Sequence, residues 1–190
     1  IYYFESALEL ARCHRALGAP DSAVVVLRRA TGTWEKWRAS ISDFEWRERH
    51  GSGLAGLFAE YGMSLLDSGR RAPESRRVVE AFDVLQTFQA RTLEERMEGR
   101  GLAGAGMRRR VTADSLRRAV LSDGELLVDL IATPDTTFAF MVSRGSIGVR
   151  MHPGTVRLGR LHTAWREATL SGADDALVRS GLGRLSDEML

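Results

Sequence analysis

The sequence predicts an α+β fold that is mostly α, with antiparallel helix hairpins followed by a small antiparallel three-strand meander with flanking helices. Three observations predict it. Apolar residues recur at helical spacing through residues 1–98, a stretch rich in Gly and Arg occupies 99–111, and short alternating segments separated by turn residues follow within 112–190. We therefore expect a helical repeat region, a linker and a second domain with these boundaries.

The composition is that of an ordinary globular protein, with 44% apolar and 27% charged residues in a chain of 190. The net charge is only +2 although the pI is about 9.1, because nearly all the basic residues are arginine. This charge does not by itself argue for a nucleic-acid partner. No apolar run approaches the roughly 20 residues of a membrane span, and the single cysteine fits a reducing compartment. We expect a cytoplasmic location.

The first two predicted helices form a hairpin. Gly18 suits the end of the first helix, and Asp21 is expected to cap the second. The segment 31–33, Thr-Gly-Thr, weakens the prediction that the second helix continues as far as Phe44. The chain opens inside a helical pattern without an initiator methionine, so we expect it to be a piece of a longer protein. The apolar faces of these helices include Leu8, Ala11, Ala23, Val26, Leu27 and Ala30.

Two further helices are predicted from apolar stripes. A polar turn over 67–73 separates them, and the later one should begin near Pro73 or Glu74 because proline is favoured in the first turn of a helix. Short breaks between four helices imply antiparallel neighbours. The stripes are Leu54, Leu57, Phe58, Tyr61 and Leu65, and then Val78, Ala81, Phe82, Leu85, Phe88 and Leu93.

The helical half resembles tetratricopeptide repeats (TPR). The pattern is Ala7-x2-Leu10-Ala11-x2-His14 followed by Ala23-x3-Leu27-x2-Ala30, and Ala81-x3-Leu85-x2-Phe88 in the second hairpin. That family places small residues where two helices cross closely. The second hairpin departs from the pattern, since Phe88 replaces a small residue and the hairpin is longer than the repeat. The alternative is a plain helical bundle.

The Gly-rich segment contains a literal G-x-G-x-x-G, from Gly99 to Gly104. A dinucleotide-binding loop must follow a strand and open a helix, so that the phosphate meets the helix N-terminus. This segment follows a predicted long helix instead. We interpret it as a flexible linker and expect no cofactor.

The second half begins with a short helix over 115–121, which Asp114 or Thr112 can cap. A largely buried strand is expected over 125–132, with further strands over 137–142 and 147–152. A helix with an inward apolar face follows, and a last helical segment is expected over 174–190. The inward residues are Val156, Leu158, Leu161, Trp165 and Ala168.

This half resembles the opening of a CHAT domain, the caspase- and separase-like domain found beside TPR repeats. The resemblance lies in the order of several pieces, and the family aligns an acidic or tyrosyl residue near Asp129. These pieces are Ala81, Leu85, Gln89-Ala90-Arg91 and Leu93, then residues 116–130, 138–142 and 182–190. It implies a cysteine endopeptidase as the parent protein, with the remainder of the CHAT domain packed on residues 112–190.

The cysteine–histidine pair that such a peptidase needs is not apparent in this sequence. A thiol requires a nearby base because the thiolate is the nucleophile. Cys13 lies in a helix and is expected to be a buried or half-buried structural thiol. The histidines show no metal-site spacing, so we expect no catalytic residue and no metal here; they are His14, His50, His152 and His162.

Aromatic residues of the helical half are candidates for a protein- or peptide-binding surface, with core packing as the alternative. These are Trp34, Trp37, Trp46 and Tyr61. In the linker, Arg108, Arg109 and Arg110 form a basic run, which is either a solvated stretch or a processing site, because some caspase relatives cut after arginine.

The expected function is therefore a fragment of a TPR–CHAT peptidase that contains the partner-recognition repeats and the non-catalytic start of the CHAT domain. The alternative is a non-enzymatic scaffold for protein interactions.

Overall fold

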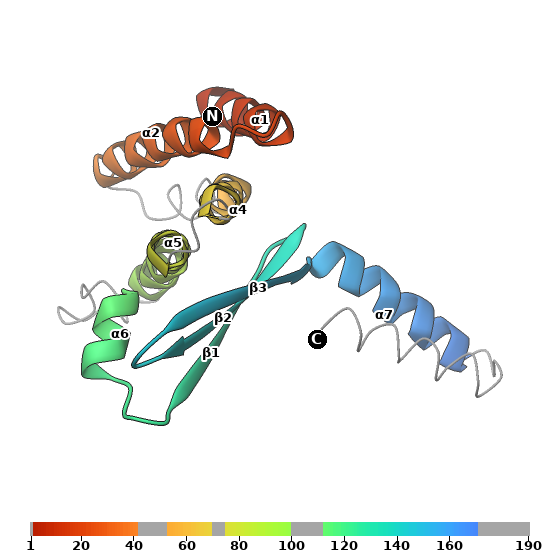
Figure 1. Cartoon of the computed structure of the whole chain (residues 1–190). Coiled ribbons are helices and arrows are strands. Elements are labelled where there is room, and N and C mark those ends of the chain that lie inside the picture. Colours follow the sequence, from red (N-terminus) through yellow and green to blue (C-terminus); the bar gives the residue numbers. More distant parts are fainter. Residues whose placement is uncertain (1, 42–52, 70–74, 100–111, 171–190) are drawn as a thin grey trace. The chain divides into compact units, whose positions relative to one another are not determined.

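A computed structural model of the chain describes residues 2–41, 53–69, 75–99 and 112–170. These residues form six helices and a three-stranded sheet (Figure 1), so the predicted α+β, mostly α, fold is confirmed. The helices are α1 (Tyr2–Ala16), α2 (Pro20–Ala39), α4 (Ala55–Gly69), α5 (Ser75–Gly99), α6 (Ala113–Ala119) and α7 (Thr155–Leu170). The strands are β1 (Leu126–Ala132), β2 (Thr136–Ser143) and β3 (Ile147–Pro153).

The chain divides into two compact units. The first comprises Ile1–Leu127 and Val142–Gly148, and the second comprises Val128–Met141 and Val149–Leu190. The first unit holds the helices α1, α2, α4, α5 and α6, whereas most of the sheet and α7 belong to the second. The domain boundaries 1–98 and 112–190 stay predictions. Except for Gly99, which ends α5, the predicted linker 99–111 lies outside the described residues.

The turn between α1 and α2 depends on glycine. Gly18 has a φ of 72°, which is costly for a residue with a side chain. The Ala19 N–H donates to the His14 carbonyl at 2.9 Å, the long-range bond of the Schellman motif that ends many helices. Helix α2 then begins at Pro20, so Asp21 lies in its first turn and is not its cap. The capping prediction is wrong because proline starts the helix one residue earlier.

Helix α2 continues without a break to Ala39, so residues 31–33 do not interrupt it. The Thr31 hydroxyl donates to the Leu27 carbonyl at 2.8 Å, and the Thr33 hydroxyl to the Arg29 carbonyl at 2.9 Å. Each threonine thus satisfies its polar group one turn back within the helix. Residues 31–33 are therefore helical although threonine and glycine have a low helix propensity.

Helices α4 and α5 extend the first hairpin into a stack. Helix α2 packs against α1 and α4, and α4 packs against α5. Helix α4 continues to Gly69, so Asp67 and Gly69 belong to the helix and not to the predicted turn. Residues 70–74 lie outside the described residues. The predicted stripes form the core of the stack: Leu57, Phe58, Tyr61, Leu65, Ala81, Phe82 and Leu85 are all buried.

Helices α4 and α5 pack closely at Gly62. A Cβ on Gly62 would lie 2.9 Å from Leu85 Cδ1, which is closer than ordinary van der Waals contact. The small residues of the first hairpin, Ala11, Ala23 and Ala30, are fully buried. Small side chains therefore occupy tightly packed positions in both hairpins.

Helix α6 joins the stack to the sheet-bearing part of the chain. Thr112 is its N-cap and accepts a hydrogen bond from the Ser115 N–H in a capping box, so of the two predicted caps Thr112 is the correct one. The Asp83 side chain of α5 accepts a hydrogen bond from the Ala113 N–H at 2.8 Å. This bond fixes the first turn of α6 to the last helix of the stack.

The three strands form a meander in the order β1-β2-β3. The Thr133 N–H donates to the Thr136 carbonyl, and the Ser143 N–H to the Ser146 carbonyl, each at 2.9 Å, which closes two short turns. Alternate side chains point to opposite faces of the sheet. Those on one face are buried: Ile131, Phe138, Phe140, Val142 and Ile147.

Strand β1 is not the largely buried strand that its composition predicts. Leu126, Val128 and Leu130 are 60%, 54% and 64% exposed, and Ile131 is the one buried residue of β1. The strand lies at an edge of the sheet. Among the described residues, no element covers the side to which these three side chains point, and this explains the error.

Helix α7 is held at its first turn by the turn between β1 and β2. The N–H groups of residues 154–156 donate to the carbonyls of residues 133–135 at 2.9 to 3.2 Å. A Cβ on Gly154 would collide with the backbone of residues 134–136, so glycine is required there. Of the predicted inward face, the described residues are not buried: Val156 is exposed, and Leu158 and Leu161 are only partly covered.

Some expectations fall on residues that the structure does not describe. These are the side chains of Trp165 and Ala168 and the helical segment 174–190. Among the described helices, none combines the length and the apolar character needed to cross a membrane.

Candidate interaction surfaces of the helical stack

Aromatic side chains gather where α1 and α2 pack together. The Phe4 ring lies 5.2 Å from Tyr3, 5.8 Å from Trp34 and 6.0 Å from Trp37, measured between ring centroids. Phe4 and Trp34 are buried, whereas Trp37 is 37% and Tyr3 is 48% exposed. The cluster therefore has an inner part that packs the hairpin and an outer part that a partner can contact.

Of the four aromatic residues predicted to bind a partner, the three that the structure describes do not form one accessible surface. Trp34 and Trp37 are neighbours, with ring centroids 5.6 Å apart, but only Trp37 is accessible. Tyr61 is buried in α4, and Trp46 lies outside the described residues. Tyr3, which the sequence did not single out, is the second accessible aromatic residue of this cluster.

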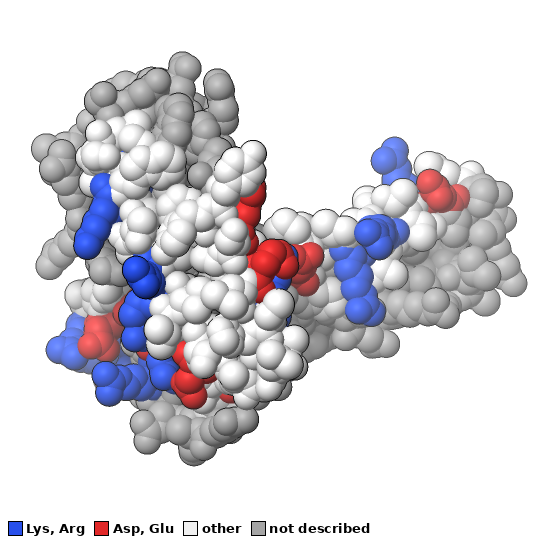
Figure 2. Space-filling view, turned by 90° about the horizontal axis from the view of Figure 1, so that it is seen from above, with Lys and Arg blue, Asp and Glu red and all other residues white. Residues whose placement is uncertain are grey.

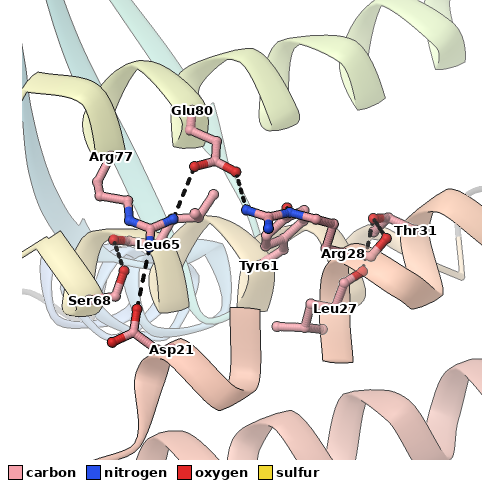
Figure 3. A network of polar contacts seen from close by, with 9 residues as sticks. All are labelled: Asp21, Leu27, Arg28, Thr31, Tyr61, Leu65, Ser68, Arg77 and Glu80. Carbon is pink, nitrogen blue, oxygen red and sulfur yellow. Dashed lines mark hydrogen bonds and ion pairs between the residues drawn. The ribbon is translucent and has the colours of Figure 1, made fainter. Parts of the chain in front are cut away.

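A polar network crosses α2, α4 and α5 (Figure 3). Arg28 Nε donates to the Tyr61 hydroxyl at 3.1 Å, and Arg28 Nη2 lies 2.7 Å from Glu80 Oε1. Arg77 Nη1 donates to Glu80 Oε2 at 3.1 Å, and Arg77 Nη2 donates to Asp21 Oδ1 at 3.3 Å. The Glu80 carboxylate is thus shared by two guanidinium groups, and the chain of contacts ties the two hairpins together.

The electrostatics of the network follow from burial and pairing. Burial raises the pKa of the Tyr61 hydroxyl above 10.0, although the hydrogen bond from Arg28 acts in the opposite direction. The hydrogen bond with Tyr61, followed by that with Glu80, raises the pKa of Arg28. The network therefore keeps Arg28 charged and Tyr61 protonated, which suits a structural link.

A second ionic link joins α1 to α4 through Glu60. This carboxylate is almost completely buried, and it accepts a hydrogen bond from Arg15 Nε at 2.6 Å. Arg12 Nε lies 3.8 Å from the same carboxylate, and Arg15 also contacts Asp67 at 3.4 Å. The hydrogen bond with Glu60 is the main cause that raises the pKa of Arg15. A buried charge is costly unless it is paired and hydrogen-bonded in this way.

Cys13 is exposed, so the prediction of a buried or half-buried thiol is wrong. The residues that α1 buries are Phe4, Ala7 and Ala11, and at 100° per residue Cys13 lies on the opposite side of the helix. His14 is adjacent in sequence and projects in a different direction.

The other histidines that the structure describes lie in different elements from Cys13. His152 is in β3 and His162 in α7, while His50 lies outside the described residues. The described residues contain no group of His, Cys, Asp or Glu that could hold a metal ion. Arg108, Arg109 and Arg110 also fall outside the described part of the chain.

Charged side chains of both signs are interspersed on the face drawn in Figure 2. Elsewhere in the described residues, Arg12 pairs with Glu9 at 2.8 Å, and Arg118 pairs with Asp114 at 3.0 Å. In both pairs the arginine contacts a carboxylate of its own helix.

Sequence reasoning missed Glu60 and Glu80, which organise the two links. Glu60 sits between the apolar positions Leu57 and Tyr61, and a charged residue so placed on a predicted buried face was an available signal. Glu80 carried no such signal, because its role depends on how α2 and α5 are placed by the fold.

The chain was compared with protein-family models, with curated proteins and with solved structures, and none of them matches it significantly.

Proposed function

We propose that this chain is part of a caspase-like cysteine peptidase of the TPR–CHAT type, comprising the partner-recognition helices and the non-catalytic start of the CHAT domain. The helical stack would bind a protein or peptide partner. The catalytic cysteine and histidine would lie elsewhere in the parent protein.

The packing of the helices supports the repeat half of the proposal. Among the described helices, α1 packs on α2, α2 on α4 and α4 on α5, and α1 also contacts α4. The small residues Ala11, Ala23 and Ala30 are fully buried, and Gly62 lies beneath Leu85. Close helix crossings at small residues are what the resemblance to TPR repeats implies.

The exposed apolar side of β1 is the main observation that supports the proposed CHAT-domain part of the chain. Leu126, Val128 and Leu130 form a row of exposed apolar side chains on an edge strand. Soluble proteins rarely leave such a row uncovered, and it marks a surface that packs against something. The remainder of a CHAT domain would supply that cover.

The bond between Asp83 and the Ala113 N–H supports communication between the two halves. It fixes the start of α6 to α5, and α6 leads directly into β1. A partner that shifts or stabilises α5 would therefore act on the element that precedes the sheet.

The test compares this chain with its parent protein. The parent sequence after Leu190 should contain a strand followed by His-Gly and a later strand followed by Cys, and the parent should cleave peptides in a manner that depends on that later cysteine. Replacing it with alanine should abolish cleavage, whereas Cys13→Ala, the matched control on the exposed side of α1, should leave the rate unchanged. If the 190-residue chain alone cleaved peptides and Cys13→Ala abolished this, the proposal would be wrong.

The basic run Arg108–Arg110 is a second part of the same proposal. It would be cut when the parent is activated, and sequencing the new N-terminus would reveal the position. A linker that stays intact in the active parent would refute this part alone.

The competing function is a scaffold without peptidase activity. The exposed rings of Trp37 and Tyr3 favour it, because accessible aromatic side chains are common anchors of protein interfaces. A parent without the cysteine and histidine signals would establish this alternative over the peptidase.

A further inference from the structure

The two edge strands of the sheet, β1 and β3, differ in how they are protected (Figure 1). Strand β3 bears the exposed Arg150 and ends in Pro153, and charged residues and prolines on an edge discourage pairing with a further strand. Strand β1 contains no proline and no basic residue, and no described strand lies on its outer side. Within the described residues, β1 is therefore the edge that suits an added strand.

The backbone of β1 presents hydrogen-bonding groups to that outer side. The Thr133 N–H donates to the Thr136 carbonyl at 2.9 Å, and this turn bond sets the antiparallel register of β1 and β2. Alternate residues of β1 bond to β2, and those between them direct their N–H and C=O groups outward. More and less exposed side chains alternate along the whole strand, which agrees with this register. The outward residues are Leu126, Val128, Leu130 and Ala132.

The side chains beside this edge are apolar. Leu126, Val128 and Leu130 are the three exposed apolar residues of β1, and all three belong to the outward set. An added strand would place alternate side chains about 5 Å from this row. Apolar residues at those positions would be covered together with the row, so the added strand should have apolar residues at alternate positions.

The charge around β1 indicates which ends the added strand should have. Residues 119–143 contain four carboxylates and no lysine, arginine or histidine, although the whole chain has a net charge of +2. Asp123 and Glu125 precede β1, Asp135 follows it, and all three are exposed. Asp123 lies 3.5 Å from Arg144, yet its side chain remains 90% exposed. A segment with a basic residue at each end would therefore meet carboxylates at both ends of β1.

The same charges argue against β1 of a second copy as the added strand. In a two-fold antiparallel pair that overlaps the full strands, the acids before one β1 would lie near Asp135 of the other copy. This would happen at both ends of the pair, and like charges on neighbouring strands are destabilising. Charge complementarity thus selects a different segment, one with basic ends.

We propose that in the parent protein β1 pairs with an extended segment that has apolar residues at alternate positions and a lysine or arginine at each end. The inference rests on the proposed function, because it takes this segment from the remainder of the CHAT domain. The segment would extend the meander to four strands. Main-chain hydrogen bonds would hold it to β1, and its basic ends would fix its placement.

A synthetic peptide tests the chemistry of this edge. The fluorescent probe has blocked termini and consists of four valines that alternate with three threonines between two lysines. Anisotropy with the 190-residue chain should show saturable binding below about 1 mM. A control peptide with glutamate in place of both lysines should bind at least about tenfold more weakly. Absence of saturable binding, or equal affinity for the two peptides, would overturn the proposal.

Variants of the two edges locate the peptide. Leu130→Pro removes an outward N–H but no bond to β2, and it should weaken binding of the lysine peptide at least about tenfold. The turn bond from the Ser143 N–H to the Ser146 carbonyl makes Met151 an outward residue of β3. Met151→Pro is therefore the matched control, and it should bind as the original chain does.

Circular dichroism shows whether each variant remains folded. Leu130→Lys, which places a cation on the β1 edge, is the second variant if Leu130→Pro is unfolded, and Met151→Lys is its control. Undiminished binding in a folded Leu130 variant would overturn the proposal, and so would an equal loss in the matching Met151 variant.

The parent protein distinguishes an internal strand from other occupants. If β1 is already paired there, the lysine peptide should bind the parent at least about tenfold more weakly than the 190-residue chain. Equal binding would overturn the proposal, because β1 would then be open in the parent. Self-association of the 190-residue chain that Leu130→Pro abolishes would assign the edge to a second copy and would also overturn it. A parent that excludes the peptide but cleaves no substrate would refute the peptidase alone.

Discussion

Glu60 joins α1 to α4 from a position that is almost completely buried. Its carboxylate contacts Arg15, whose side chain is 33% exposed, and Arg12, whose side chain is 42% exposed. Water therefore reaches the two guanidinium groups and screens their charge, whereas the Glu60 carboxylate is removed from water. The cost of losing this residue lies mainly in the partly buried guanidinium group that would be left behind.

Glu60→Gln should lower the free energy of unfolding by about 1–3 kcal/mol, a value reduced from that of fully buried pairs because Arg15 is partly exposed. Urea denaturation measures the change. Glu9→Gln removes an exposed partner of Arg12 and should cost less than about 1 kcal/mol. Equal losses in the two variants would show that the buried position of Glu60 contributes nothing.

Tyr61 gives the stack a dependence on alkaline pH. Burial raises its pKa in the folded chain above 10.0, so the unfolded chain loses this proton at a lower pH than the folded one. The resulting stability is fully present below about pH 10 and is lost as the pH rises through the folded pKa. Denaturation at a series of pH values should show this fall. Tyr61→Phe should make it smaller, and an unchanged fall would assign it to other groups.

At the scale of single elements, helical periodicity predicted the helices well but not where they end. The stripe from Leu57 to Leu65 is buried as expected. The continuation of α2 through residues 31–33 could not be predicted, because packing compensates for weak propensity there. The exposure of β1 was also unpredictable, since an apolar run does not reveal whether a second layer covers it.

Gly32→Ala should raise the free energy of unfolding by about 0.5–1 kcal/mol, because nothing lies near a Cβ at this position and alanine favours the helix. Thermal and urea unfolding provide the measurement. Gly62→Ala is the contrasting variant, since its Cβ would lie 2.9 Å from Leu85 Cδ1. The strain should cancel the gain there, and an equal gain at both positions would contradict the close crossing of α4 and α5.

Gly154→Ala should destabilise the attachment of α7 by at least about 2 kcal/mol, because the new Cβ would meet the backbone of residues 134–136. Hydrogen exchange of the amides in the first turn of α7 would detect it as lost protection. Gly159 has no neighbour near a Cβ, so Gly159→Ala should leave that protection unchanged or increased. Retained protection in Gly154→Ala would contradict the close packing of the first turn of α7 on the turn between β1 and β2.

At the scale of the whole molecule, the fold class and the order of elements could be predicted from the sequence, but the candidate surfaces could not. Of two aromatic residues that the sequence singled out together, Trp37 is exposed and Trp34 beside it is buried. Sequence spacing identifies apolar faces, whereas exposure depends on which helices meet.

The exposed row on β1 should make the chain bind apolar dyes. Replacing Leu126, Val128 and Leu130 together with threonine, which suits a strand, should reduce fluorescence of an anilinonaphthalene sulfonate dye while the free energy of unfolding changes by less than about 1 kcal/mol. Phe138→Ala, on the buried face, should instead cost about 3–5 kcal/mol. Undiminished dye fluorescence in the threonine variant would place the apolar surface elsewhere.

The hydrogen bond from the Ala113 N–H to Asp83 makes one amide proton a reporter on two helices. This proton exchanges with solvent only when α6 separates from α5 or when α5 itself opens. A ligand that binds the folded stack and not the opened one lowers the population of the opened α5 by mass action. The exchange rate at Ala113 would then fall as ligand is added, so occupancy of the helical stack would be measurable at the first residue of α6.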